Sequence, residues 1–274
     1  MANSVNTNFG ATVALQSLNK TNRELDMVQK RVSTGYRVSD AKDDGASFAV
    51  AQGLRADVKG NEAVNERLSV AKGLLSVTQE GLKGISDTVG EMKKVMVKLG
   101  DASLSTDERA QYNADYVALQ ADVTKYIGQS AFGGTNLIKA SAADVNVISD
   151  ASGGTITLKS KDLSAALTAL GGAPADAAAA IAKLGAGAAT LETFEKAVND
   201  ELAAVGANMR TVENQDNFVR VLGDTINDAI GAIVDADLAK ESAKLQALQI
   251  RQQLGTQTLS IANQSPSILL SLFQ

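Results

Sequence analysis

Residues 68–99, LSVAKGLLSVTQEGLKGISDTVGEMKKVMVKL, carry the sequence pattern that decides the fold. Side chains recur along this stretch at alternating steps of three and four residues, and only Thr78 among them is not apolar. This spacing is typical of a coiled-coil seam, in which one stripe of a long helix packs against a partner helix. We therefore predict one helix over about residues 45–99. The recurring residues are Leu68, Ala71, Leu75, Thr78, Leu82, Ile85, Val89, Met92, Met96 and Leu99.

A second stripe with the same alternation lies near the other end of the chain, from Val198 to Ile233. Two such stripes are natural partners because each buries the apolar face of the other. We predict a mainly α fold in which helices over about 45–99 and 191–231 form a long antiparallel, coiled-coil-like rod. The seam of this rod is expected to contain Leu68, Leu75, Leu82, Ile85, Val89, Met92, Val205, Met209, Val212, Val219 and Ile226.

Between these helices the sequence predicts a shorter helix and a small β region. Ser105 and Glu108 have the spacing of a capping box, so we expect a helix over about residues 106–128. Residues 130–190 are rich in Gly, Ala, Ser and Thr. Short β-prone runs around two Gly-Gly pairs predict one or two hairpins in this insert, followed by a surface loop with a helical turn or two.

Glycine is unusually frequent in the predicted long helix. Each interior glycine destabilises a helix by about 1 kcal/mol relative to alanine. Two explanations stay open: the helix tolerates the glycines, or the missing side chains allow a neighbouring segment to approach closely. The positions are Gly45, Gly53, Gly60, Gly73, Gly81, Gly84 and Gly90.

The two ends of the chain lack charge. Residues 1–19 and 252–274 contain no Asp, Glu, Lys or Arg, although 21% of the whole chain is charged. Apolar residues still recur there at helical spacing, and those near the C-terminus occupy more than one helix face, which requires several neighbours. We expect other copies of the chain to cover them; frayed polar tails are the alternative. The predicted self-assembly residues are Val13, Leu15, Leu18, Leu25, Val28, Val32, Leu245, Leu248, Ile250, Leu254, Leu259 and Ile261.

The composition excludes several classes of function. The chain has no Cys and no His, which removes thiolate nucleophiles, imidazole bases and nearly all zinc sites. Its net charge of −5 argues against nucleic acid as a partner. No segment is long and apolar enough to suggest membrane insertion, and the N-terminus has no secretory leader pattern. We expect no enzyme activity, no catalytic residues and no cofactor.

One acidic cluster, Asp40, Asp43 and Asp44, has partial similarity to a calcium loop. Lys42 occupies a position that requires an acid, and Ala51 stands where the loop needs its glutamate. We therefore predict no metal site here. The expected role of the cluster is to complement the dipole at the start of the following helix.

Both ends of the chain resemble a known family. Residues 18–60, LNKTNRELDMVQKRVSTGYRVSDAKDDGASFAVAQGLRADVKG, look like the N-terminal signature of bacterial flagellin. Residues 229–274, with ANQSPSILLSL, look like the matching C-terminal signature. The resemblance implies that 1–43 and 232–274 pair as helices of an inner tube, and that 44–231 form the rod domain. The expected function is then a structural subunit that self-polymerises into the flagellar filament.

The resemblance also implies a set of partners. These are further copies of the chain, an export chaperone that holds the C-terminal helix, the flagellar type III export apparatus, and the junction and cap proteins of a secreted, extracellular filament. Flagellins are often glycosylated, and the candidates in the insert are Ser141, Ser149, Ser152, Thr155 and Ser164.

The resemblance carries one expected difference from many flagellins. An innate-immune receptor reads an arginine-rich stretch of their rod helix. Here the corresponding run is residues 90–98, with Glu91 where a key arginine is expected, so we predict weak or absent recognition.

Two other functions fit the pattern less well. A hook–filament junction protein shares the same end architecture, but it adds once and does not polymerise, and ANQSPSILLSL favours the filament protein. A membrane-surface amphipathic protein would need a cationic helix face, which the sequence lacks.

Overall fold

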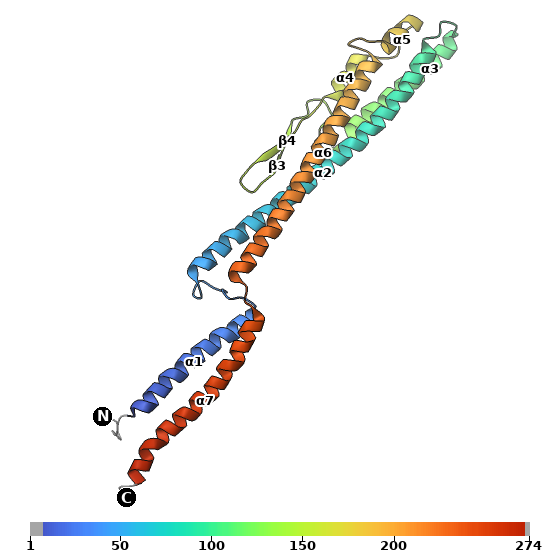
Figure 1. The fold of residues 1–274 in the computed structure, drawn as a ribbon. Helices are drawn as coiled ribbons and strands as arrows, with labels where there is room; N and C mark the ends of the chain where they lie inside the picture. The colour runs from blue at the N-terminus through green and yellow to red at the C-terminus, as the bar shows by residue number, and fades with distance from the viewer. Residues whose placement is uncertain (1–7, 272–274) are drawn as a thin grey trace. The chain divides into compact units, whose positions relative to one another are not determined.

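The computed structural model describes residues 8–271, with side chains through Gln264, as a helical protein with two small antiparallel hairpins (Figure 1). This confirms the expected mainly α fold. The described residues form two compact units, which we call the core unit, residues 57–224, and the terminal unit, the residues up to Ala56 and from Thr225 onward. The helices are α1 (Phe9–Thr34), α2 (Gly45–Leu99), α3 (Thr106–Gln129), α4 (Leu163–Leu170), α5 (Ala177–Leu184), α6 (Leu191–Val234) and α7 (Leu238–Ser271).

In the core unit, α2 and α6 run antiparallel. Two ion pairs show the register: Lys72 Nζ lies 3.7 Å from the Asp216 carboxylate, and Lys93 Nζ lies 3.1 Å from that of Glu195. As the residue number rises on α2, its partner on α6 falls. The stripes identified in the sequence face one another along this pairing and form one apolar cluster with α3 and the insert.

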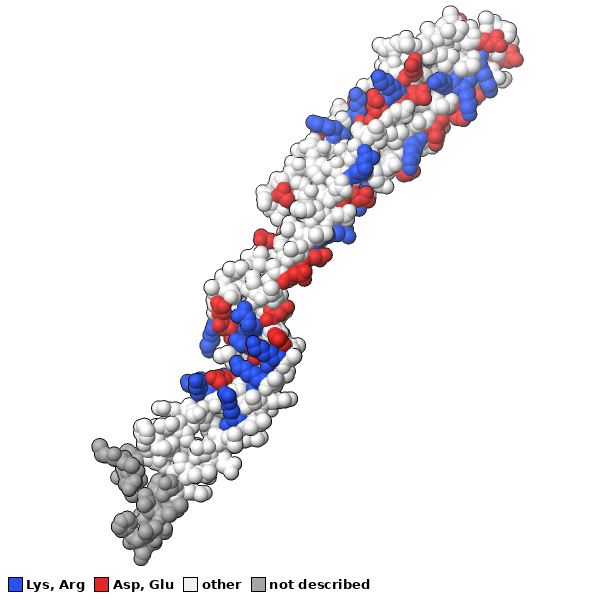
Figure 2. All heavy atoms as spheres, in the orientation of Figure 1, with Lys and Arg blue, Asp and Glu red and all other residues white. Residues whose placement is uncertain are grey.

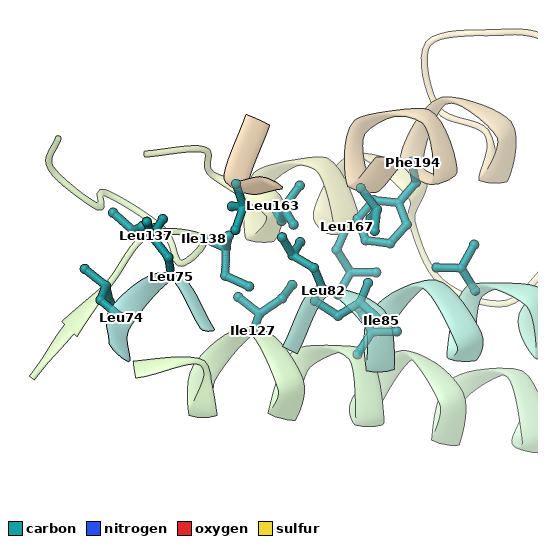
Figure 3. Packing of buried hydrophobic residues seen from close by; sticks show 14 of the residues in the cluster. Leu74, Leu75, Leu82, Ile85, Ile127, Leu137, Ile138, Leu163, Leu167 and Phe194 are labelled. Carbon is teal, nitrogen blue, oxygen red and sulfur yellow. The ribbon is translucent and has the colours of Figure 1, made fainter. Parts of the chain in front are cut away.

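The apolar cluster is tightly packed around α2. Leu75, Leu82 and Ile85 are fully buried, and Phe194 of α6 is 2% exposed. Figure 3 shows Leu82 and Ile85 among side chains from α3, α4 and α6. Burying a Leu, Ile or Phe side chain contributes about 1.5–3 kcal/mol. The core unit therefore covers its own apolar stripes.

Two polar residues interrupt the seam. Thr78 is fully buried, and its hydroxyl donates to the Leu74 carbonyl oxygen at 2.9 Å. Asp216 is 3% exposed, and one of its carboxylate oxygens lies 3.1 Å from Arg220 and 3.7 Å from Lys72. The Thr78 hydroxyl is thus hydrogen-bonded within α2, whereas the Asp216 carboxylate is paired with one cation from α2 and one from α6.

Helix α3 returns along α2 and begins with the expected capping box. The Ser105 hydroxyl accepts from the Glu108 backbone N–H at 3.3 Å, and the Glu108 carboxylate accepts from the Ser105 N–H at 3.0 Å. Arg109 then donates to the Leu99 carbonyl oxygen at 2.8 Å, which satisfies a group left free at the end of α2. These contacts fix the turn between the two helices.

The insert contains both hairpins, which lie in the predicted region. Strands β1 (Ala131–Phe132) and β2 (Thr135–Asn136) are joined by Gly133 and Gly134, whose φ angles of +57° and +82° suit a tight hairpin turn. Strands β3 (Val145–Ile148) and β4 (Thr155–Leu158) pair with Val147 opposite Ile156. Helices α4 and α5 follow; the short helix α5 lies within residues 171–190, where a loop with a helical turn or two was predicted, whereas α4 was not predicted.

The glycines of α2 divide between the two explanations. A Cβ at Gly81 would lie 2.9 Å from the Ser130 Cβ, and one at Gly84 would lie 3.0 Å from the Tyr126 ring. Close approach of α3 and its end therefore explains these two. Gly60 and Gly73 also have neighbours within 3.0 Å of such a Cβ. The remaining positions, Gly45, Gly53 and Gly90, have open space and are simply tolerated.

Candidate self-assembly surface

Helices α1 and α7 of the terminal unit pack against each other through a small apolar cluster. Leu25 and Val28 of α1 and Leu248 of α7 are buried, with Val32 and Leu245 packed around them. This cluster is far smaller than that of the core unit because each helix has only one long neighbour. Pairing with α7 therefore uses only one stripe of α1.

Polar contacts fix the antiparallel register of α1 and α7. Arg31 and Glu241 form an ion pair at 3.1 Å, and both side chains are less than a quarter exposed. Further along, the Gln252 side-chain amide donates to Asn22 at 2.9 Å. A Cβ at Gly255 would lie 3.2 Å from Leu18, so this glycine lets the two helices approach closely. The register is thus set by contacts along most of the pair.

A short crossing holds the ends of α1 and α6 together. Gly35 ends α1 in the left-handed conformation, at a φ of +76°. The backbone N–H groups of Arg37 and Val38 both donate to the Val234 carbonyl oxygen, at 2.7 and 3.2 Å. The Ala236 N–H donates in turn to the Gly35 carbonyl oxygen at 2.9 Å. These bonds connect segments that are about 200 residues apart in the chain.

The acidic cluster has structural partners. Asp44 accepts from the N–H groups of Ala46 and Ser47, both at 3.1 Å, so it caps α2 as expected for an acid at a helix start. Asp40 and Asp43 instead hold Lys30, at 2.6 and 2.9 Å. Hydrogen bonding to the Lys30 ammonium lowers the pKa of the Asp43 carboxyl well below its usual range. Within residues 8–264 no group of acidic side chains is arranged to hold a metal ion.

The predicted assembly residues fall into three groups. Leu25, Val28 and Leu248 are buried in the α1–α7 pair, and Leu18, Val32, Leu245 and Leu259 are half-buried. The remaining five are exposed: Val13 by 49%, Leu15 by 47%, Ile250 by 58%, Leu254 by 58% and Ile261 by 63%. The pair therefore covers only part of the predicted set.

The exposed group lies where the helices carry no charge. The first charged side chain of α1 is Lys20, and the last of α7 is Arg251. In Figure 2 the corresponding surface of the terminal unit is white, whereas red and blue side chains follow the core unit. We call this surface the uncharged face; its exposed apolar residues are Phe9, Val13, Leu15, Leu254 and Ile261.

The predicted seam residues lie in the interior, with two exceptions. Met209 and Ile226 are half-buried, and the others are buried.

Sequence reasoning missed two exposed apolar sets. Phe9 is 78% exposed and opens α1. On α6, Phe218, Val221 and Leu222 are 60%, 64% and 37% exposed. Their i, i+3, i+4 spacing forms a second apolar stripe beside the seam, but in the sequence this spacing merges with that of the seam residue Val219.

The described helices include no segment with the length and apolarity needed to span a membrane.

The family model for the bacterial flagellin N-terminal helical region matches residues 5–143, and the model for the C-terminal helical region matches 188–273. Flagellin FljM of Caulobacter vibrioides is 37% identical over 272 residues, which cover 99% of each chain.

Two solved structures share the fold. The crystal structure of Bacillus cereus flagellin gives a TM-score of 0.51 at 23% identity, covering 56% of this chain and 88% of that one. A putative flagellar hook-associated protein from Vibrio parahaemolyticus gives 0.59 at 12% identity, covering 70% and 100%. The family models and the full-length relative show more than the fold: this chain belongs to the bacterial flagellins, the structural, non-enzymatic subunits of the extracellular flagellar filament.

Proposed function

We propose that the uncharged face of α1 and α7 is the surface through which the subunit polymerises. The observation that carries this proposal is the coincidence of exposed large apolar side chains with the stretches of both helices that lack charge. Exposed apolar area contributes about 25 cal/mol per Å² when it is buried, so covering this face with other copies would drive assembly. Contacts of charged side chains would then set geometry more than strength.

In this proposal the parts of the chain have separate roles. Residues 1–43 and 232–274 form the inner-tube domain, and residues 44–231 form the outer rod domain. The small apolar cluster of the α1–α7 pair supports this division, because that pair has the greater need for additional neighbours.

Electron microscopy of purified subunit after addition of short filament seeds tests the proposal. We expect long uniform tubes from the full chain, and none from chains lacking residues 1–43 or 232–274. Truncated chains that still elongate seeds would contradict the placement of the assembly surface. Monomers that cap seeds without elongating them are the outcome expected of a junction protein, which the flagellin relatives do not favour.

The exposed apolar side chains of α7 also bear on how the subunit is exported. We propose that the subunit passes through the flagellar type III export apparatus, that a chaperone holds α7 before assembly, and that junction and cap proteins bind the growing filament. A helix with exposed Ile250, Leu254 and Ile261 needs protection from premature association. A pull-down from flagellated cells with α7 as bait, with Leu254→Asp and Ile261→Asp as the control, tests whether the chaperone reads these side chains.

Weak recognition by the innate-immune receptor stays a prediction. Glu91 is exposed and forms an ion pair with Lys94 at 2.6 Å, so a carboxylate stands where the receptor would meet an arginine. A receptor reporter assay should show low activity for the wild-type chain and a gain for Glu91→Arg. Full activity of the wild type would contradict the prediction.

A further inference from the structure

The core unit contains a preformed apolar groove of about 260 Å³ between α2 and the two hairpins. Arg67, Val70 and Leu74 line it from α2, Phe132 from β1, and Val145 and Ile148 from β3. Val70, Phe132 and Ile148 are 51%, 39% and 46% exposed, so the groove is open to a ligand.

The groove depends on a glycine of α2. A Cβ at Gly73 would lie 2.9 Å from the Phe132 ring, so the absence of a side chain lets this ring pack directly on the helix. The register of the β3–β4 hairpin then fixes the opposite wall, with Ile148 paired to Thr155. Both walls are held by backbone pairing and close packing, so the groove does not need a ligand in order to form.

The same unit exposes a set of apolar side chains on α6. Phe218, Val221 and Leu222 lie on one side of the helix and are 60%, 64% and 37% exposed. Asp224 follows one turn after Val221 and is exposed as well. We call these four residues the α6 stripe.

The charges at the two surfaces are complementary. Arg67 is the charged residue in the lining of the groove, and Asp224 borders the apolar part of the α6 stripe. Within residues 8–264 neither side chain forms an ion pair. Each surface therefore presents apolar side chains next to one charge of opposite sign to that of the other.

We propose that the α6 stripe of one subunit docks in the groove of a neighbouring copy, with Asp224 facing Arg67. This inference rests on the proposed function, since it supplies a second contact for a chain that polymerises. A contact between two different surfaces of the same molecule is heterologous, and it generates open helical filaments when the rotation between copies does not close a ring. The uncharged face would supply most of the affinity, and the stripe and groove would fix the relation between neighbours.

Charge reversal tests the contact directly. Arg67→Glu and Asp224→Arg should each slow elongation from seeds at least ~10-fold, because each places like charges together. The double variant Arg67→Glu/Asp224→Arg should return to within ~3-fold of wild type, since only a direct pair restores the attraction. Light scattering after addition of seeds, at low salt, measures all four rates.

Apolar substitutions sharpen the test. Phe218→Ser and Val70→Ser, one on each surface, should slow elongation, whereas Val97→Ser, at a 60% exposed position of α2 outside both surfaces, should not. All these positions are exposed, so urea unfolding of the monomers should be nearly unchanged, which separates docking from folding.

The outcomes distinguish the two proposals. A double charge variant as slow as the single variants, or Phe218→Ser at the wild-type rate, would overturn the docking contact while leaving polymerisation through the uncharged face intact. A wild-type chain that fails to elongate seeds would remove the proposed function, and the contact with it.

Discussion

In the core unit, Leu75 and Leu82 of α2 are fully buried, whereas in the terminal unit Leu254 and Ile261 of α7 are 58% and 63% exposed. The side chains are of the same kind, and both sets lie on long helices. The difference is the number of neighbours: α2 packs against α3, α6 and the insert, whereas α7 packs against α1. One unit completes its core within the chain, and the other leaves part of its apolar surface for further copies.

In the terminal unit, the polar contacts lie between α1 and α7 and not on the outward surface. Arg31 and Glu241, and Asn22 and Gln252, hold α1 and α7 in register across their contact. Residues 1–19 and 252–274, which include the uncharged face, contain no charged side chain. A charge there would have to be buried on assembly, at a penalty of several kcal/mol. The terminal unit can therefore be weakly stable in the monomer and become stable when other copies cover its uncharged face.

The variant Ile261→Asp should give the largest effect, because it places a charge on the exposed apolar surface that distinguishes the terminal unit from the core unit. A carboxylate placed on the uncharged face would be buried without a partner on assembly, so we expect no elongation from seeds. Thermal unfolding of the core unit should be unchanged, and Ile261→Leu should polymerise normally. Normal filaments from Ile261→Asp would show that this face stays in water.

Two leucine-to-alanine variants, one in each unit, compare how much a buried and an exposed leucine contribute to the stability of the monomer. Leu82→Ala should lower the free energy of unfolding by about 2–5 kcal/mol, because it leaves a cavity in a fully buried cluster. Leu254→Ala should change it by less than about 0.5 kcal/mol, since the side chain is exposed. Urea denaturation followed by circular dichroism gives both values. Equal losses would mean that the terminal unit is as complete as the core unit.

Glycine substitutions test close packing along α2. Gly90→Ala should stabilise the monomer by up to about 1 kcal/mol, because alanine favours helix and the site is open. Gly81→Ala should destabilise it, because the new Cβ would meet Ser130, and Gly84→Ala should stabilise it less than Gly90→Ala does, because its Cβ would contact the Tyr126 ring. Thermal melting of the three variants decides this, and a stabilised Gly81→Ala variant would contradict the packing described here.

The smallest expected effect concerns pH and the terminal unit. Hydrogen bonds from Lys30, Ser39 and the backbone lower the pKa of Asp40 and Asp43 below the ordinary value of 3.8. Such groups contribute stability that is present above that value and is lost as the pH falls through the lower folded pKa. Asp43→Asn should therefore weaken the terminal unit at neutral pH, and its difference from wild type should become smaller as the pH falls below 3.8. Limited proteolysis across this range would show it, and a pH-independent difference would refute it.

The sequence predicted the helical fold because the seam repeat of α2 and α6 is long and nearly unbroken. The hairpins were also indicated, since Gly133 and Gly134 have turn chemistry. Helix α4 and most of the glycine contacts were not predictable, because they depend on which segments meet in space. The apolar spacing of α1 and α7 marked candidate assembly residues, but only the structure separates Leu248, buried in the pair, from Ile250 and Ile261 on the outside.

The α6 stripe was hidden for a similar reason. Phe218, Val221 and Leu222 lie next to the seam residue Val219, so their periodicity merges with that of the seam. Only the burial of Val219 at 1% exposure and the exposure of its neighbours separate the two stripes.

Amide hydrogen exchange, compared between monomer and seeded filament, shows directly whether neighbouring copies complete the burial of α1 and α7. We expect α1 and α7 to exchange rapidly in the monomer and to become strongly protected in the filament, because neighbouring copies cover their exposed side chains. The core unit, including residues 68–99, should be protected in both states, with added protection limited to the groove and the α6 stripe. If α1 and α7 were already fully protected in the monomer, or unprotected in the filament, they would not be the surface that assembly buries.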